Sequence, residues 1–131
     1  EFFIKSNTES IRKDLADITL NELIPSIIYK DFDIFAKSLT KFQKYNASLY
    51  SSIQKSIYLS NDIAKIIKKI SSSFNVGCGQ SSWGPTSYMF VDSKKDLKEI
   101  LSILDKTISM YNNLSYNVVS AKNNGRKLTY T

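Results

Sequence analysis

Glycine and proline, the residues that most often interrupt helices, are concentrated in one short stretch of this chain. The segment 76–92, VGCGQSSWGPTSYMFVD, holds three of the four glycines, one of the two prolines, and the only Trp and Cys among 131 residues. Helical patterns are free to extend elsewhere, because few helix breakers lie outside this segment. The segment itself must contain tight turns or close backbone contacts, which glycine tolerates better than any other residue.

The remainder of the N-terminal part shows apolar residues at the three- and four-residue spacing typical of amphipathic helices. The predicted helices run from about 8 to 20, from about 21 with Pro25 near its start, over 32–49, and over 61–70, with another over 94–111. The residues expected to cap them are Thr8 or Ser10, Asn21, Asp31, Ser60 or Asn61, and Ser93. The aromatic residues on the face of 32–49 are expected to belong to the core.

Short apolar runs of a different kind predict strands in the C-terminal part. They are FNVGCG (74–79), TSYMFVD (86–92), LSYNVVSA (114–121) and RKLTY (126–130). Helices followed by strand, strand, helix, strand and strand favour an α+β class, with helices packed on an antiparallel sheet of about four strands. No repeat or linker divides residues 1–131, so we expect a single domain.

Composition excludes several function classes. With no His, the chain can form neither a His-based zinc site nor a Ser-His-Asp or Cys-His catalytic arrangement of its own. The lone Cys78 forms no internal disulfide, fits a reducing, cytoplasmic location, and is expected to be a packed residue rather than a nucleophile. The net charge of +6 comes from dispersed lysines, which favours solvated helix faces over a nucleic-acid surface. No apolar run approaches the ~20 residues of a membrane-spanning helix, so we expect no membrane partner.

The residues between the two strands of 74–92 could serve either binding or folding. Gln80, Ser81, Ser82 and Thr86 offer neutral donors, and the backbone N–H groups of a tight loop can form a concavity for an anion. A tight hairpin around a buried Trp83 would explain the same composition. The loop is neither a Walker loop nor a dinucleotide fingerprint, because no Lys follows the glycines as required and a strand rather than a helix comes next.

The stretch GCGQSSWGPT, residues 77–86, resembles the third conserved motif of the GHMP kinase superfamily, and its wording is most similar to the β-ribofuranosylaminobenzene 5′-phosphate synthases of that superfamily. Many kinases of the superfamily have a shorter loop without the Gln or the Trp. Further similar positions are Leu23, Pro25, Asp31, Phe32, Phe35, Leu39, Gln43, Gln54, Tyr58, Asn123 and Gly125. The chain departs from the pattern at Ala36, Lys55 and Ser56, where the family often has Gly.

The resemblance covers the C-terminal half of such an enzyme. It implies a ferredoxin-like C-terminal domain whose partner is the enzyme's own N-terminal phosphate-loop domain, which is absent from residues 1–131, and a homodimer. It also implies condensation of phosphoribosyl pyrophosphate with 4-aminobenzoate or 4-hydroxybenzoate, releasing CO2 and pyrophosphate, for methanopterin-type cofactors. Mg2+ is expected on the pyrophosphate in the full-length enzyme, whereas this domain alone is expected to bind no cofactor or metal. In this interpretation the glycines gather because the loop lies against the phosphate loop.

The resemblance also assigns candidate roles. The residues expected to face a phosphorylated small-molecule substrate are Gly79, Gln80, Ser81, Ser82, Gly84 and Thr86. Trp83 could stack on the aromatic substrate or pack in the core, Gln43 and Gln54 could face the cleft or do nothing, and Arg126 could neutralise a phosphate or stay a surface residue. No residue is assigned as general acid or base.

Two other functions stay open at this point. One is the same domain in an ATP-dependent small-molecule kinase, and the other is a free-standing binding domain.

Overall fold

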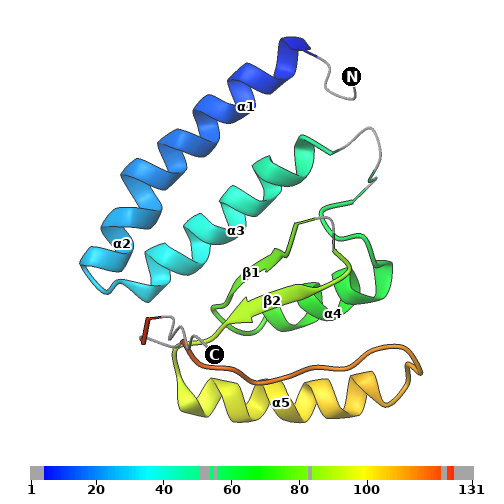
Figure 1. The fold of residues 1–131 in the computed structure, drawn as a ribbon. Helices are drawn as coiled ribbons and strands as arrows, with labels where there is room; N and C mark the ends of the chain where they lie inside the picture. The colour runs from blue at the N-terminus through cyan, green and yellow to red at the C-terminus, as the bar shows by residue number, and fades with distance from the viewer. Residues whose placement is uncertain (1–4, 51–53, 55, 83, 122–123, 126–131) are drawn as a thin grey trace, which may run out of the picture.

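The computed structural model describes residues 5–50, 54, 56–82, 84–121 and 124–125. In chain order its elements are α1 (Lys5–Ile18), the π-helical turn η1 (Thr19–Leu23), α2 (Ile24–Ile28), α3 (Phe32–Ser48), α4 (Asn61–Ser71), β1 (Gly77–Gln80), β2 (Ser87–Phe90) and α5 (Lys94–Ile108). In Figure 1, α1 and α3 lie side by side on one side of the hairpin formed by β1 and β2, and α4 and α5 lie on the other. The described residues therefore form an α+β fold with a small antiparallel sheet.

Local hydrogen bonds explain where three of the helices begin. The Asp31 carboxylate accepts from the Ile34 N–H at 3.0 Å, and the Ser60 hydroxyl accepts from the Ile63 N–H at 3.3 Å. The Ser93 hydroxyl accepts from two N–H groups in the first turn of α5. Each cap satisfies backbone donors that a helix start otherwise leaves without a partner. The caps predicted at Asp31 and Ser93 are confirmed, and of Ser60 and Asn61 it is Ser60 that caps α4.

The predicted helix start at Asn21 is wrong. Asn21 lies inside η1, where its side chain donates to the Asp17 carboxylate at 2.7 Å, and the helix continues from α1 into α2. Pro25 lies in the first turn of α2, and the preceding Ile24 N–H bonds to Thr19 O, five residues back. A proline ring collides with the carbonyl four residues earlier in a regular helix. The wider π turn before Pro25 gives that ring room, so the helix need not stop.

The two strands pair as an antiparallel hairpin with a fixed register. Gly77 lies opposite Phe90, and Gly79 lies opposite Tyr88. These strands confirm the two predicted over 74–79 and 86–92, although each is shorter than predicted. Cys78 belongs to the core beside α4, and the Gln80 side chain bonds to Leu59 in the segment before α4, whereas the glycines face α3.

The expected sheet of about four strands is not what the described residues form. Residues 114–121, predicted as a third strand, adopt no strand, and Val119 in that segment is 86% exposed. A strand requires a hydrogen-bonded neighbour, and the segment predicted to follow it, 126–130, lies outside the described residues. The segment instead runs back alongside α5 (Figure 1), where the Tyr116 hydroxyl donates to the Asp105 carboxylate.

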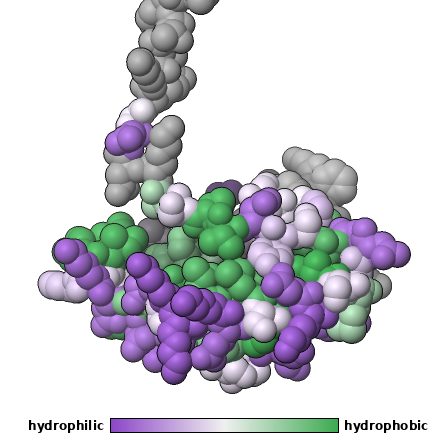
Figure 2. All heavy atoms as spheres, turned by 90° about the horizontal axis from the view of Figure 1, so that it is seen from below, coloured by the Kyte–Doolittle hydropathy of each residue, from purple (hydrophilic) through white to green (hydrophobic). Residues whose placement is uncertain are grey.

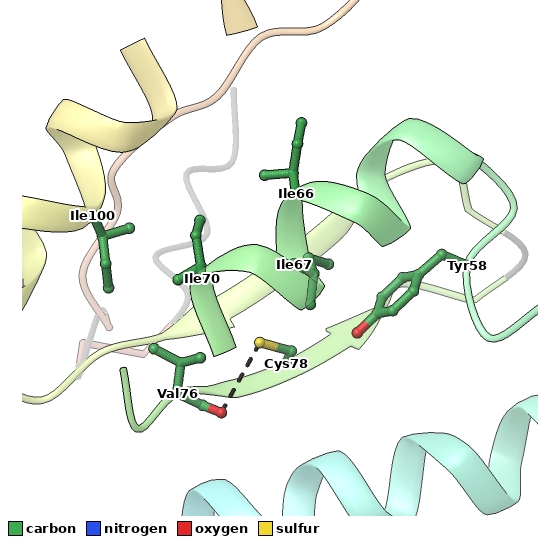
Figure 3. Close-up of a cluster of buried hydrophobic side chains, with 7 residues drawn as sticks. All are labelled: Tyr58, Ile66, Ile67, Ile70, Val76, Cys78 and Ile100. Carbon is green, nitrogen blue, oxygen red and sulfur yellow. Dashed lines mark hydrogen bonds between the residues drawn. The ribbon is translucent and has the colours of Figure 1, made fainter. Parts of the chain in front are cut away.

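The core lies between the hairpin and the helices α4 and α5. Figure 3 shows its buried side chains, which come from α4, β1, α5 and the segments just before α4 and β1: Ile66, Ile67, Ile70, Cys78, Ile100, Tyr58 and Val76. The predicted apolar face of α4 supplies three of these seven residues, Ile66, Ile67 and Ile70. Seen from the side of α5, the outer surface is mostly hydrophilic, with hydrophobic residues gathered between the charged ones (Figure 2). No helix in the described part of the chain has both the length and the apolar composition to cross a bilayer.

On the opposite face, α3 approaches β1 closely because of the two strand glycines. A Cβ atom at Gly77 would lie 3.2 Å from the Cα of Ala36, which is helix backbone and has little freedom to move. At Gly79 it would lie 2.6 Å from the Gln43 side-chain amide carbon and collide with the Tyr88 ring. Of the three glycines in 76–92, Gly84 alone has a positive φ, of 78°. Gly77 and Gly79 serve close packing within the strand.

Helix α3 also covers the edge of β1 that β2 leaves open. The Cys78 N–H donates to the Thr40 hydroxyl at 3.2 Å, and the Gln80 N–H donates to the Gln43 side-chain oxygen at 3.5 Å. Farther along, the Phe35 ring meets Phe90 of β2 edge to face, with ring centroids 5.4 Å apart. Phe35 is only half-buried and lies outside the core cluster, so the expected core role of the aromatic residues on α3 is not confirmed.

The close approach of α3 to β1 predicts that alanine lowers stability at Gly79 but not at Gly125. Gly79→Ala should lower the free energy of unfolding by about 1–3 kcal/mol, because the new methyl group forces Tyr88 and Gln43 to move. Gly125→Ala is the matched control, since a Cβ there meets nothing within 4 Å, and should change stability by less than about 0.5 kcal/mol. Urea unfolding monitored by circular dichroism measures both. Equal effects of the two substitutions would contradict this account of the packing.

Candidate functional site

The described residues of the connection between β1 and β2, 81–82 and 84–86, form a turn at one end of the hairpin. The Ser81 N–H donates to Thr86 O at 2.9 Å, and the Gly84 N–H donates to Ser81 O at 2.9 Å. Ser82 has a positive φ of 52°, and the Gly84–Pro85 peptide bond is cis. The turn is therefore held by its own backbone, with the side chains of Ser81, Ser82 and Thr86 exposed to solvent.

The Gln80 side chain is directed into the protein, below this turn. Gln80 is 7% exposed, and its side-chain oxygen accepts from the Leu59 N–H at 2.6 Å. Its side-chain nitrogen donates to the Gln54 side-chain oxygen at 3.3 Å and to Ser82 O at 3.4 Å. A buried amide with both ends hydrogen-bonded is strongly fixed, because losing a partner would leave a buried polar group unsatisfied. Gln80 thus joins the turn to the segment before α4.

Gln43 of α3 makes a second connection to the hairpin. Its side-chain nitrogen donates to the Tyr88 hydroxyl at 2.6 Å, while its oxygen accepts from the Gln80 N–H. Burial raises the pKa of Tyr88, an effect that the Gln43 hydrogen bond partly opposes, so the hydroxyl stays protonated at neutral pH. Tyr88 was not singled out from the sequence. Its position opposite Gly79 in a predicted hairpin was the signal that could have identified it.

The structure brings together three of the residues predicted for the site, Gln43, Gln54 and Gln80. With Ser82 they line a cavity of about 10 Å³, a volume on the order of a single water molecule. All three amides hydrogen-bond to protein groups: Gln54 donates to Ser56 O at 2.7 Å and accepts from Gln80. The cluster supports the turn from below, and the exposed hydroxyls lie on the turn itself.

The other predicted site residues are placed differently. Gly79 lies in β1 and is buried, and Gly84 provides the positive φ of the turn. Trp83 and Arg126 lie outside the described residues. For each of them, both the binding role and the structural role remain predictions. Next to the turn, the Ser87 hydroxyl is buried and has no hydrogen-bond partner among the described residues. An unsatisfied buried hydroxyl is costly, and it marks a position where a further partner would be stabilising.

Cys78 is packed in the core. It is 1% exposed, and burial raises the pKa of its thiol to about 11 from an ordinary 9.0. Because the thiolate is the reactive form, a thiol in this environment is a poor nucleophile near neutral pH. Its position agrees with the expected packing role.

No group of three or more His, Cys, Asp or Glu side chains suited to a metal ion occurs in the described ranges. Comparison with protein-family models, with curated proteins and with solved structures found no match to this chain.

The role of Gln80 predicts a loss of stability when its amide is removed. Gln80→Leu should lower the free energy of unfolding by about 1–3 kcal/mol, because the Leu59 N–H and the Gln54 side-chain oxygen lose their partner. Ser81→Ala, at the exposed neighbouring position, should stay within about 0.5 kcal/mol of the parent chain. Thermal and urea unfolding of the two variants provide the comparison. A Gln80→Leu variant as stable as Ser81→Ala would show that the amide network contributes nothing.

The environment of Cys78 predicts slow thiol chemistry. At pH 8 the folded chain should react with a thiol reagent at least tenfold more slowly than the same chain in guanidinium, because the folded thiol is buried and its raised pKa leaves little thiolate. The thiol reagent is one that releases a chromophore when it reacts. The absorbance of that chromophore therefore measures the reaction of Cys78, the only cysteine in the sequence. Equal rates in the two conditions would mean that Cys78 is accessible in the folded state.

Proposed function

We propose that this chain is the C-terminal domain of an enzyme of the GHMP kinase superfamily that resembles the β-ribofuranosylaminobenzene 5′-phosphate synthases. In this proposal the full enzyme joins phosphoribosyl pyrophosphate to 4-aminobenzoate or 4-hydroxybenzoate, with loss of CO2 and pyrophosphate. The motif GQSSWGPT at residues 79–86 is the feature that suggests it. A ferredoxin-like arrangement of the whole domain is part of the same proposal.

The observation that carries the proposal is the contrast between the turn and its base. The base is rigid, because Gln80 is hydrogen-bonded at both ends of its amide, whereas the hydroxyls of Ser81, Ser82 and Thr86 are exposed on the turn. Donors held in place before the substrate arrives stabilise charge that develops during a reaction without having to reorganise. In the proposed reaction these hydroxyls bind phosphate oxygens as pyrophosphate leaves. The buried Ser87 hydroxyl nearby offers one more group for hydrogen bonding.

The remaining parts of the machinery would come from outside the described residues. Mg2+ would be held by the pyrophosphate oxygens, because the described residues provide no cluster of carboxylates for it. The phosphate loop would come from the enzyme's N-terminal domain. We therefore expect residues 1–131 alone to show no turnover.

The full-length natural protein provides the test. Incubated with phosphoribosyl pyrophosphate, Mg2+ and carboxyl-labelled 4-aminobenzoate or 4-hydroxybenzoate, it should release labelled CO2 only when phosphoribosyl pyrophosphate is present. Ser82→Ala should reduce kcat/KM by about tenfold to a hundredfold, as expected for loss of a donor to developing charge. Ser102→Ala, at an exposed position of α5, is the matched control and should leave the rate unchanged.

Two outcomes would overturn the proposal. CO2 release that does not need phosphoribosyl pyrophosphate would exclude this reaction. Absence of release, together with ATP consumption on a panel of sugars, acids and alcohols, would assign the domain to a small-molecule kinase instead.

A further inference from the structure

A second concave surface lies away from the turn, between α3 and α4 along the open edge of β1. This groove encloses about 700 Å³, within the range of small-molecule sites in proteins. Its floor is mainly apolar and is formed by Ala36, Ala64, Ile67, Phe74 and Val76. An apolar floor of this size removes water from the hydrocarbon part of a ligand, which favours binding.

The charged side chains that line the groove all have one sign. Four lysines line it, Lys37, Lys41 and Lys44 from α3 and Lys68 from α4, and no carboxylate does. Lys41 is paired with Glu22 at 2.5 Å, whereas the other three lysines form no ion pair with any described residue. Cations at the border of an apolar cleft attract an anionic group and leave the cleft floor for an uncharged body.

Inside the groove lies a hydrogen-bond donor without a partner. Tyr58 is 9% exposed and lines the groove, yet its hydroxyl has no hydrogen-bond partner among the described residues. Figure 3 shows the Tyr58 ring reaching from the loop before α4 toward β1, with the hydroxyl on the β1 side near Cys78. Burial raises the pKa of this hydroxyl well above its ordinary value, so it remains a donor across the physiological range. This oxygen is not among the fully buried polar atoms that lack a partner, so it is accessible from the groove and can donate to an acceptor that a ligand brings.

The groove is poorly suited to an added peptide strand, although it follows the edge of a sheet. Strand addition uses the free N–H groups of the edge. On β1, the N–H groups of Cys78 and Gln80 already donate to the Thr40 hydroxyl and the Gln43 side-chain oxygen. A small molecule needs none of these donors.

We propose that the groove between α3 and α4 binds a small amphipathic anion, a carboxylate or phosphate monoester whose apolar body covers the Ala36, Ala64 and Val76 floor while its acid group lies near the lysines and the Tyr58 hydroxyl. The ligand could come from free acids or from phosphorylated alcohols, since both carry the same pairing of charge and hydrocarbon. None of the residues that line this site belongs to the turn at 81–86, and its test uses no residue of that turn.

Calorimetric titration of the intact chain with decanoate and with decyl phosphate tests the site, and decyltrimethylammonium serves as a probe of equal chain length and opposite charge. At least one of the anions should bind, the cation should not, and the stronger anion identifies the preferred acid group. Chemical shifts of the Ala36 and Ala64 methyl groups should move with the bound anion.

Two neighbouring lysines on α4 provide a matched pair of variants. Lys68→Gln should weaken anion binding about two- to fivefold, whereas Lys69→Gln, whose side chain does not line the groove, should leave it unchanged. Tyr58→Phe should weaken binding about three- to tenfold, because it removes only the hydroxyl. If Tyr58→Phe disturbs folding, the lysine pair still decides the question.

Equal binding of the cationic probe, equal effects of the two lysine substitutions, or no binding of either anion would each overturn the proposal. So would displacement of a bound anion by an extended peptide that shifts the β1 amide resonances, because it would assign the groove to strand addition.

Discussion

The contact between α3 and β1 is the constraint on which the rest of this structure depends. Gly77 lets the strand lie against the backbone of Ala36, and any side chain at that position would push the helix away. At that distance Thr40 and Gln43 can accept the N–H groups of the open strand edge. An unprotected edge would expose backbone donors to other chains. One close contact therefore both positions the helix and protects the sheet.

The elements that the sequence predicted well are those fixed by interactions within a few residues. Asp31, Ser60 and Ser93 cap the helices that follow them through bonds to N–H groups two or three positions away. The apolar face of α4 follows from residue spacing alone, and Ile70 on that face is fully buried. Such patterns can be recognised from sequence because both partners of the interaction lie in one short segment.

The features that the sequence did not predict depend on partners far along the chain or on a small difference in helical geometry. The apolar run 114–121 has strand composition, but a strand requires a neighbour, and among the described residues it has none. Asn21 resembles a cap, yet the π turn before Pro25 carries the helix past it. The inward direction of Gln80 depends on Leu59, which lies 21 positions away, and no local pattern indicates that pairing.

The residues of β1 alternate between two faces of the strand, and all of them are needed for packing. They can therefore be distinguished from exposed residues that are free to bind a ligand. The two glycines of GCGQ face α3, where side chains would not fit, and Cys78 and Gln80 point to the opposite side and are buried there. These four residues are therefore accounted for by packing, even though their composition is that of a ligand-binding loop. The hydroxyls of Ser81, Ser82 and Thr86 in the turn are exposed and have no such structural role. The same holds for Lys37, Lys44 and Lys68 beside the groove, which form no ion pair with a described residue. Binding functions are best sought in residues of this second kind, because the fold would tolerate their replacement.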